Sequence, residues 1–457
     1  MINKIIEKLN QYTNIAILGF GREGKTTYEF IRKHNKDIKL TIIDKSEQVK
    51  DNNPEVANDP NTTFVMGPTY LEGLDQYDLI IKSPGISLLG IDTTNLRDKI
   101  TSQLELVLEV NKKNMIGITG TKGKSTTSSL LYKIIKDQNE NVILAGNIGI
   151  PLLSEIENCD ENTILVIEMS SHQLEYLNTS PHIAVILNLF EDHLDHSGTI
   201  EHYHENKLQI FKNQETDDYM IYCCDDKTLA NYVANNAYKG IPCTISRTTT
   251  KATCFQEDDY INLENEQVYN TKSERKLLGT HNITNIMVCL TIAKILKLDL
   301  VKATESVSTF EPLEYRLQNI GTVDGVTYYT DTLATIPEAT IEAINSIPNI
   351  DSLIFGGMDR GINYDKLIEF LKTAPVRNLI CMPTTGHDIG HALGEIENKN
   401  IYYVETLEEA VDLAKEITKK GTNCVLSPAA ASYTQFKNYA DKGDKFKAFV
   451  YSKKQSN

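Results

Sequence analysis

The chain has 457 residues, which is enough for two to four domains that each bury a hydrophobic core. Hydrophobic residues make up 40% and charged residues 24%, as in an ordinary soluble globular protein. The net charge is −16 and no long basic stripe is present, so we expect neither a nucleic-acid partner nor a membrane partner.

Short apolar runs alternate with helical patterns along nearly the whole chain, which is typical of β-α units around parallel sheets. The first block contains the predicted strand NIAILGF (14–20), the helix KTTYEFIRK (25–33), and the strands LTIID (40–44) and DLIIKSPGI (78–86).

A second block begins near residue 100. It contains the helix QLELVLEV (103–110) and the strands NMIGITG (114–120), TILVIEM (163–169) and IAVILNLF (183–190). Between the first two of these strands, one buried helix face is predicted by the spacing of Thr127, Leu130, Leu131, Ile134 and Ile135. Residues from about 215 to 280 are more polar and could carry short strands.

A third block begins near residue 313. Its predicted strands are VTYYTDT (326–332), SLIFGG (352–357), NLICM (378–382), IYYVE (401–405) and NCVLSP (423–428). We therefore predict an α/β protein of three domains. A Rossmann-like domain would span residues 1–100, a central domain with a P-loop ATPase-type parallel sheet 101–313, and a C-terminal Rossmann-like domain 314–457.

The eight cysteines are scattered and include no C-x-x-C pair, which argues against a structural zinc site, a redox motif and a dense disulfide framework. No apolar run reaches the length of about 18 residues that a transmembrane helix needs. We expect a cytoplasmic monomer.

The glycines Gly19, Gly21 and Gly24 follow the first predicted strand, and Asp44 ends the next one. This is the fingerprint of a dinucleotide site, in which glycines allow close approach of a pyrophosphate and an acid meets the ribose. The alternative is a Rossmann-like turn that binds some other nucleotide, and the rest of the chain has to decide between the two.

The segment GITGTKGKSTT (117–127) runs from a predicted strand into a predicted helix. Its backbone N–H groups and the helix N-terminus would form a cradle for phosphates. Lys124 would reach the β- and γ-phosphates and the Ser125 hydroxyl would bind Mg²⁺. The alternative, a purely structural turn, would not need the strand, glycines, Lys-Ser pair and amphipathic helix in this order.

Two further strand ends carry candidate metal ligands. Glu168 ends one strand and His193 follows the next, at the edge where open α/β sheets bind ligands. A carboxylate there suits Mg²⁺. A solvated strand-end residue is the alternative for each. A zinc site built from the six histidines between His172 and His204 is conceivable, but no thiolate accompanies them.

Lys207 interrupts an inward-facing helical stripe with Ile200, Tyr203 and Phe211. A buried amine favours its neutral form, and a neutral lysine can react with carbon dioxide to give a carbamate that binds a metal. The pattern by itself favours the alternative, a lysine that extends over the helix end into solvent.

The segments TDTLATIP (330–337) and LSPAAAS (426–432) each run from a strand into a predicted helix. The N–H groups of the second, with the Ser432 hydroxyl, would suit a carboxylate. Taken alone, both segments are explained by ordinary turn and capping chemistry.

Together these segments resemble the Mur ligases over nearly the whole chain. The shared motifs are GFGREG, KSPGI, GITGTKGKSTT, GNIG (146–149), EMSSHQLE, NLFEDHLDH, the Lys207 helix, GTHNITN (279–285), Tyr315-Arg316, the Asp331 loop, GGMDRG (356–361) and SPAAASYTQFKNY. The resemblance is greatest to the member that adds D-glutamate to UDP-N-acetylmuramoyl-L-alanine with ATP. It implies that the first domain binds the uridine nucleotide, which removes the need for a nicotinamide.

The resemblance also implies a role for each motif residue. ATP would be bound by Gly120, Thr121, Lys122, Gly123, Lys124, Ser125, Thr126, Asn282, Asn285, Arg316 and Asp331. Two Mg²⁺ ions would be held by Ser125, Glu168, His193 and carbamylated Lys207, and the catalytic residues would be Lys124, Glu168, His193 and Lys207. The UDP-sugar would contact Gly19, Gly21, Asp44, Ser83 and Asn147, and the glutamate Thr335, Arg360, Ser432 and Tyr439.

The sequence departs from the family pattern in four places. Leu333 and Ile336 stand where the family usually has lysine and asparagine, Tyr315 replaces a histidine, and His172 replaces a phenylalanine. An L-glutamate-adding variant is therefore an alternative. Three rival classes are a folylpolyglutamate synthase-like amide ligase, a nicotinamide oxidoreductase and a non-catalytic relative.

Overall fold

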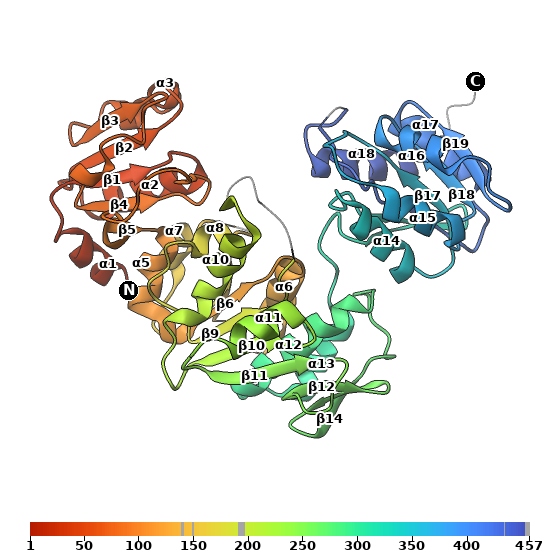
Figure 1. The fold of residues 1–457 in the computed structure, drawn as a ribbon, viewed down its shortest axis with the longest axis horizontal. Helices are drawn as coiled ribbons and strands as arrows, with labels where there is room; N and C mark the ends of the chain where they lie inside the picture. Colours follow the sequence, from red (N-terminus) through yellow and green to blue (C-terminus); the bar gives the residue numbers. More distant parts are fainter. Residues whose placement is uncertain (139–140, 149, 191–196, 434, 453–457) are drawn as a thin grey trace. The chain divides into compact units, whose positions relative to one another are not determined.

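The structure is a computed structural model that describes residues 1–138, 141–148, 150–190, 197–433 and 435–452 (Figure 1). The chain divides into two compact units. Unit 1 comprises Met1–Ser273 and Thr284–Val307, and unit 2 comprises Glu274–Ile283 and Ser308–Asn457. Each unit is described by itself.

Unit 1 begins with a five-stranded parallel sheet in the order β3-β2-β1-β4-β5. Its strands are β1 (Ile15–Leu18), β2 (Leu40–Asp44), β3 (Thr62–Met66), β4 (Leu79–Lys82) and β5 (Ile100–Thr101). The helices of this region are α1 (Ile2–Leu9), α2 (Arg22–His34), α3 (Val49–Asn52) and α4 (Pro54–Ala57). β1 is buried along its whole length, as its apolar run predicted.

The second sheet of unit 1 has nine strands in the order β14-β13-β12-β11-β10-β9-β6-β8-β7. They are β6 (Met115–Thr119), β7 (Val142–Gly146), β8 (Ile164–Glu168), β9 (Ile183–Ile186), β10 (Tyr219–Cys223), β11 (Ile241–Ser246), β12 (Cys254–Glu257), β13 (Tyr260–Leu263) and β14 (Glu266–Asn270). Pairing is parallel from β7 to β12 and antiparallel beyond it. The polar stretch from about 215 to 280 thus carries the short strands β10–β14.

The helices of this second region are α5 (Gln103–Asn111), α6 (Lys124–Lys136), α7 (Leu152–Glu155), α8 (Ser171–Leu174), α10 (Ile200–Lys212), α11 (Lys227–Ala234), α12 (His281–Ile295) and α13 (Leu300–Thr309). In α6, all five residues of the predicted inward face are buried. That face anchors the helix to the sheet, so its N-terminus is held at the carboxyl end of β6.

Unit 2 contains a six-stranded sheet in the order β15-β16-β20-β17-β18-β19. Its strands are β15 (Gln318–Val323), β16 (Val326–Thr330), β17 (Ile350–Phe355), β18 (Asn378–Cys381), β19 (Asn400–Tyr403) and β20 (Asn423–Leu426). Its helices are α14 (Pro337–Ser346), α15 (Asp365–Thr373), α16 (Thr385–Leu393), α17 (Leu407–Ile417) and α18 (Tyr439–Tyr451). The β15–β16 pair is antiparallel, and the described pairs from β16 to β19 are parallel.

Helices cover both faces of the third sheet. One core cluster includes Ile344 of α14 and Leu367 of α15, and the other includes Val411 of α17 and Phe446 of α18. Such a two-sided cover explains why the strands read as continuous apolar runs. The predicted α/β class with three parallel-rich sheets is confirmed. The domain boundaries near 100 and 313 stay predictions.

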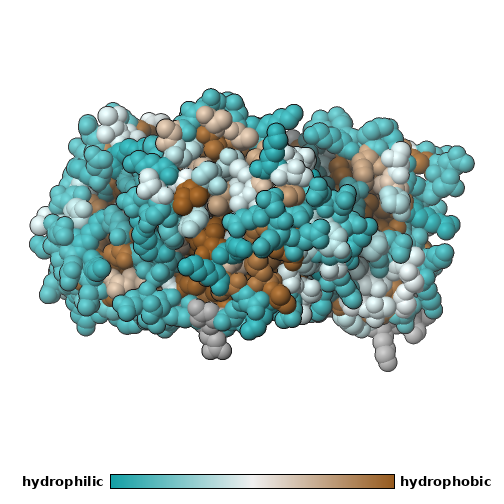
Figure 2. Space-filling view, turned by 90° about the horizontal axis from the view of Figure 1, so that it is seen from below, coloured by the Kyte–Doolittle hydropathy of each residue, from teal (hydrophilic) through white to brown (hydrophobic). Residues whose placement is uncertain are grey.

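Within the described residues, no helix is both long and apolar enough to span a membrane. Hydrophilic residues cover most of the face shown in Figure 2, with smaller hydrophobic patches among them. This distribution agrees with a chain in which 24% of the residues are charged.

Candidate active site

The predicted phosphate loop lies between β6 and α6, at the carboxyl edge of the second sheet. Gly120 and Gly123 have φ angles of +149° and +87°. A Cβ atom at Gly120 would lie 2.9 Å from the Leu187 Cβ, and one at Gly123 would lie 2.8 Å from the Asn285 Oδ1. The loop therefore needs glycine at both positions, and the Asn285 side chain lies next to it.

Lys124 begins α6 and turns its side chain back over the loop. Its Nζ donates hydrogen bonds to the carbonyl oxygens of Gly120 (2.8 Å) and Thr121 (3.1 Å). Backbone N–H groups and a lysine at a helix N-terminus are the parts of a phosphate cradle. The amine lies within reach of any anion that this loop would bind.

Glu168 ends β8, the strand next to β6. Its side chain is 1% exposed. One carboxylate oxygen accepts a hydrogen bond from the Asn147 Nδ2 at 2.7 Å, and the other is buried with no hydrogen-bond partner among the described residues. A buried, unpaired carboxylate oxygen is costly unless something else binds it. Beside a phosphate loop, this oxygen fits a Mg²⁺ ion, which prefers oxygen ligands.

Lys207 is buried in α10, with 1% of its surface exposed. Its Nζ donates to the Gly120 carbonyl at 3.1 Å and lies 4.7 Å from the centre of the Tyr203 ring. The interpretation that the pattern alone favoured, a lysine extended into solvent, is therefore wrong. Lys124 and Lys207 both reach the same carbonyl, so two amines converge beside the phosphate loop.

The histidine predictions have different outcomes. His193 lies outside the described residues. Among the residues that are described, the one group of three potential metal-binding side chains is Glu215, Asp217 and Asp218, which contains no histidine. Asp218 precedes β10, at the amino edge of the sheet, and this group pairs with lysines such as Lys112. It is separate from the phosphate loop, and no described histidine cluster supports zinc.

The predicted uridine-nucleotide residues meet at the carboxyl edge of the first sheet. Asp44 accepts a hydrogen bond from the Phe20 N–H at 2.6 Å, and the Ser83 hydroxyl donates to the Gly19 carbonyl at 2.7 Å. Gly21 precedes α2, and a Cβ there would meet no atom within 4 Å, so the turn is open. The carboxyl edge at the strand-order reversal between β2, β1 and β4 is where such sheets bind ligands.

The two sheets of unit 1 are joined close to these residues. The Gln173 side chain donates to the Glu23 carboxylate at 3.1 Å, and the Lys82 ammonium lies 3.5 Å from Glu175. Burial of these side chains raises the pKa of the Glu23 carboxyl and lowers the pKa of the Lys82 amine. The nucleotide-type turn and the strand end that carries Glu168 thus belong to one packed unit.

Asp331, Thr335, Arg360 and Ser432 of unit 2 lie on the segments that follow β16, β17 and β20, whereas Arg316 lies before β15 and Tyr439 begins α18. Asp331 is buried and accepts hydrogen bonds from the Ser427 hydroxyl (2.9 Å) and the Leu317 N–H (3.2 Å). Burial raises the pKa of Asp331 to about 7, against the lowering effect of these bonds and of Arg316.

The residues predicted for the amino acid differ in burial. Ser432 is 4% exposed, and its hydroxyl has no hydrogen-bond partner among the described residues. The main-chain carbonyl of Tyr439 accepts a hydrogen bond from the Thr332 hydroxyl at 2.8 Å. Arg360 is exposed and Thr335 is half-buried.

Asn282, predicted to approach the ATP, lies in the first turn of α12. It is buried, and its side-chain amide donates to the Leu278 carbonyl at 2.6 Å. This bond holds the amide against its own chain.

Comparison with known proteins decides the family. The model of the Mur ligase middle domain matches residues 118–293, and that of the Mur ligase MurD-like N-terminal domain matches residues 13–107. The UDP-N-acetylmuramoylalanine–D-glutamate ligase of Clostridioides difficile (strain 630) is 31% identical over 439 residues, covering 95% of this chain and 97% of that protein. The chain belongs to the Mur ligase family.

Further relatives agree. The UDP-N-acetylmuramoylalanine–D-glutamate ligase of Oenococcus oeni is 31% identical over 96% of this chain and 97% of that protein. Two solved Mur ligase structures from Thermotoga maritima share the fold. The UDP-N-acetylmuramate–alanine ligase has a TM-score of 0.59 at 18% identity, covering 95% of this chain and 98% of its own. The MurF ligase in complex with ADP has a TM-score of 0.58 at 16% identity, and the match covers 97% of this chain and 95% of that protein.

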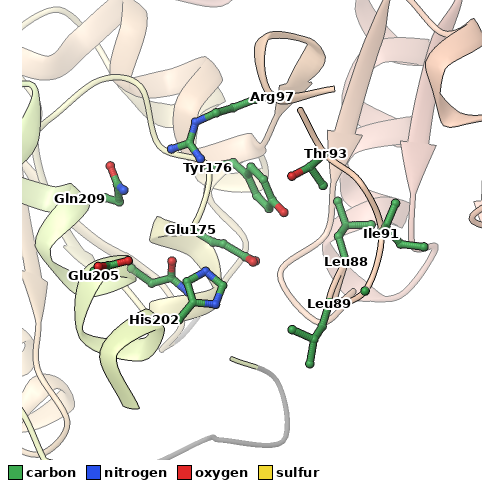
Figure 3. Close-up of a pocket in the computed structure, with 12 residues that line it drawn as sticks. Leu88, Leu89, Ile91, Thr93, Arg97, Glu175, Tyr176, His202, Glu205 and Gln209 are labelled. Carbon is green, nitrogen blue, oxygen red and sulfur yellow. The ribbon is translucent and has the colours of Figure 1, made fainter. Parts of the chain in front are cut away.

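This Mur ligase also has a cavity of about 280 Å³ beside the predicted site (Figure 3). One wall is the loop that follows Ser83 and includes Leu88, Leu89 and Ile91, and another is the α10 face with His202 and Glu205. Arg97 and Tyr176 point into the space between them (Figure 3). No predicted site residue lines this cavity, but its two walls belong to the substrate loop and to the helix that carries Lys207.

This Mur ligase has a further buried lysine, whose burial was not predicted from the sequence. Lys442 in α18 is 1% exposed, and its Nζ donates to the Gly356 carbonyl at 2.9 Å. The signal was present, because Lys442 continues the stripe of the buried residues Phe446 and Val450 at a spacing of four. It is the same signal that singled out Lys207.

Proposed function

We propose that this Mur ligase joins D-glutamate to UDP-N-acetylmuramoyl-L-alanine, with cleavage of ATP to ADP and phosphate, in the synthesis of peptidoglycan precursors. The observation that carries the proposal is the phosphate loop with Glu168 and Lys207 beside it. Near-full-length relatives that are named for this reaction support the choice of substrates.

In the first half-reaction, the terminal alanine carboxylate attacks the γ-phosphorus of ATP. The bond from that phosphorus to the β-γ bridging oxygen breaks, and an acyl phosphate and ADP form. Residues Gly120–Thr126 would surround the phosphates, and Lys124 would move from the loop carbonyls to the β- and γ-phosphate oxygens. Bound Mg²⁺ would neutralise the charge that develops on those oxygens.

Two groups of residues would hold the metal ions. Ser125 and Glu168 suit a first Mg²⁺, because Glu168 has a buried oxygen with no other described partner. Lys207 and His193 suit a second. For this role the neutral Lys207 amine adds to carbon dioxide and releases a proton, which leaves a carbamate with two oxygen ligands. The amines of Lys124 and Lys207 both donate to the Gly120 carbonyl, so two positive charges would lie close together there. This repulsion favours the neutral form of the Lys207 amine.

In the second half-reaction, the amine of D-glutamate attacks the acyl carbon, and the bond from that carbon to the phosphate oxygen breaks. Thr335, Arg360, Ser432 and Tyr439 would hold the incoming amino acid. The unpaired buried hydroxyl of Ser432 is suited to donate to a carboxylate.

The remaining predicted residues would bind the rest of the two nucleotides. Gly19, Gly21, Asp44 and Ser83 would contact the uridine diphosphate, and Asn147 the muramoyl group. Asn282 and Asn285 would approach the adenine and the phosphates of ATP, and Arg316 and Asp331 of unit 2 would also bind ATP. The open turn at Gly21 supports the assignment of the uridine diphosphate to this part of unit 1. The position of Asn285 beside Gly123 supports the assignment of Asn285 to ATP.

The test supplies UDP-N-acetylmuramoyl-L-alanine, ATP and Mg²⁺, and compares phosphate release with D-glutamate, L-glutamate and other amino acids. We expect release with D-glutamate and little with the others. Release with L-glutamate only would favour the variant that Leu333 and Ile336 suggest. Release only when a folate replaces the UDP-sugar would favour a folylpolyglutamate synthase-like enzyme, and no release with either glutamate would defeat the proposal.

A further inference from the structure

Three loops of unit 2 carry the residues proposed for the incoming amino acid, and a set of hydrogen bonds joins them. The Asp331 N–H donates to the Leu426 carbonyl at 2.8 Å, which joins the β16 and β20 loops. The Gly356 N–H donates to the Pro428 carbonyl at 2.9 Å, which joins the β17 and β20 loops. These bonds run between main chains and exist whatever the side chains are.

Lys442 adds a side-chain link between α18 and the β17 loop. Its Nζ donates to the Gly356 carbonyl at 2.9 Å and lies 5.4 Å from the centre of the Phe436 ring. From Gly356, the loop continues to Arg360, and α18 begins at Tyr439, one helical turn before Lys442. The lysine therefore connects the segment that carries Arg360 with the segment that carries Tyr439.

The position of Lys442 does not call for a lysine on packing grounds. The residue is 1% exposed on a stripe with Phe446 and Val450, where an apolar side chain of similar length would fill the same space. No carboxylate pairs with it within the described part of the chain, and burial lowers the pKa of its amine to about 7. What distinguishes lysine from methionine here is the hydrogen bond to Gly356.

We infer that Lys442 is a positioning residue for the incoming amino acid, because it fixes the loop of Arg360 relative to the helix of Tyr439. The inference rests on the proposed function, in which both residues hold the amino acid. It concerns only the second half-reaction, since the contacts of Lys442 in the described part of the chain, with Gly356 and Phe436, involve no residue proposed for the γ-phosphate or the metal ions. Loss of the link should weaken glutamate binding and leave acyl-phosphate formation intact.

The experiment compares the wild type with Lys442→Met in two assays. Ligation is measured against D-glutamate concentration, and acyl-phosphate formation is measured as hydroxamate when hydroxylamine replaces the amino acid. We expect the KM for D-glutamate to rise about tenfold in Lys442→Met, the size that loss of one hydrogen bond produces. We expect the KM for ATP and the rate of hydroxamate formation to stay within about twofold.

Two further variants complete the test. Lys442→Arg keeps a donor of similar reach and should bring the KM for D-glutamate back to within about threefold of the wild type. Lys445→Met is the matched control, because Lys445 lies on the same helix and contacts the same Phe436 ring but pairs with Asp441 at the surface. It should leave both assays unchanged.

A folded Lys442→Met protein with an unchanged KM for D-glutamate would overturn the inference, as would an equal loss in both assays. Should that variant not fold, Lys442→Gln takes its place with the same expected result and the same contradiction, because its amide nitrogen is one bond closer to the main chain than the lysine Nζ and should lose the hydrogen bond to Gly356. Failure of the proposed function itself would be seen separately, as a wild type that forms hydroxamate but ligates no glutamate.

Discussion

At the scale of single residues, the proposed carbamate makes Lys207 the side chain on which the proposed chemistry depends most. Replacement by alanine removes the amine that the carbamate requires and leaves Glu168 in place. We expect Lys207→Ala to lower kcat by about 100-fold or more, since loss of groups that hold a metal or orient its ligands has effects of this order. Added formate or acetate should restore part of the activity, because a small carboxylate can occupy the space of the carbamate.

Lys212→Ala is the control for that variant, because Lys212 is exposed at the end of the same helix. It should have normal activity and no response to added carboxylate. Near-normal activity of Lys207→Ala would rule out the carbamate role, and a large loss without rescue would leave Lys207 as a structural residue of the phosphate loop.

Asp331 gives a pH dependence whose sign follows from its burial. The pKa of Asp331 is raised to about 7 in the folded protein, whereas an unfolded aspartate titrates near 3.9. Between these values the folded chain holds a proton that the unfolded chain has lost, so the free energy of unfolding falls as the pH rises from about 4 to 7. Asp331→Asn cannot titrate and should lack this part of the decline.

The measurement for Asp331 is urea unfolding, followed between pH 5 and 8 for the wild type and for Asp331→Asn. The wild type should lose stability relative to the variant as the pH rises through this range. Parallel stability curves would show that the carboxyl is already ionised at pH 5, with Arg316 and Ser427 outweighing its burial.

The limits of prediction at this scale are visible in the two buried lysines. A helical stripe indicates the side of the helix from which a residue projects, so both Lys207 and Lys442 could be placed inward from sequence. The depth of the amine depends on a tertiary contact, the Gly120 carbonyl for one and the Gly356 carbonyl for the other. No local pattern contains that information, and the solvated alternative was therefore favoured for Lys207.

At the scale of secondary-structure elements, the turn from β6 to α6 carries a test of the phosphate loop. Gly123 has a φ angle of +87°, and an added Cβ would lie 2.8 Å from the Asn285 Oδ1. A left-handed conformation costs a non-glycine residue about 1–2 kcal/mol, so Gly123→Ala should distort the loop. We expect its Kd for ATP, measured by isothermal titration calorimetry, to rise about tenfold.

Lys136→Ala, at the exposed far end of α6, is the matched control and should bind ATP normally. Unchanged ATP affinity in Gly123→Ala would mean that the loop does not form the phosphate site. A parallel measurement of thermal unfolding separates a local change in the loop from a loss of the whole fold.

The elements themselves were predicted well where apolar periodicity was strong. The inward face of α6 and the apolar runs of β1, β6, β8 and β20 were recognisable in the chain because burial on both faces leaves a continuous signal. The strands β12–β14 gave only the expectation of short strands, because each has only four or five residues and mixes polar with apolar ones, which leaves no continuous apolar run. Their order in the sheet depends on long-range pairing that no local pattern encodes.

At the scale of the whole molecule, the family explains why motifs spread over the chain belong together. Three parallel-rich sheets each present a carboxyl edge, and one or more of the predicted residues lie at each edge, among them Asp44, Glu168 and Asp331. Residues could be assigned to the carboxyl edges from the sequence, because the end of each apolar run indicates where a strand ends. It did not predict the cavity between the Ser83 loop and α10, which arises where two sheets of unit 1 are packed together.

The central claim, a ligase that works through an acyl phosphate, is tested most directly by following oxygen. UDP-N-acetylmuramoyl-L-alanine labelled with ¹⁸O in its terminal carboxylate is incubated with ATP, Mg²⁺ and D-glutamate, and the released phosphate is analysed by mass spectrometry. Because the carboxylate oxygen attacks the γ-phosphorus and leaves with it, we predict one ¹⁸O atom in each phosphate formed from fully labelled substrate. Ligation that releases unlabelled phosphate would contradict the mechanism.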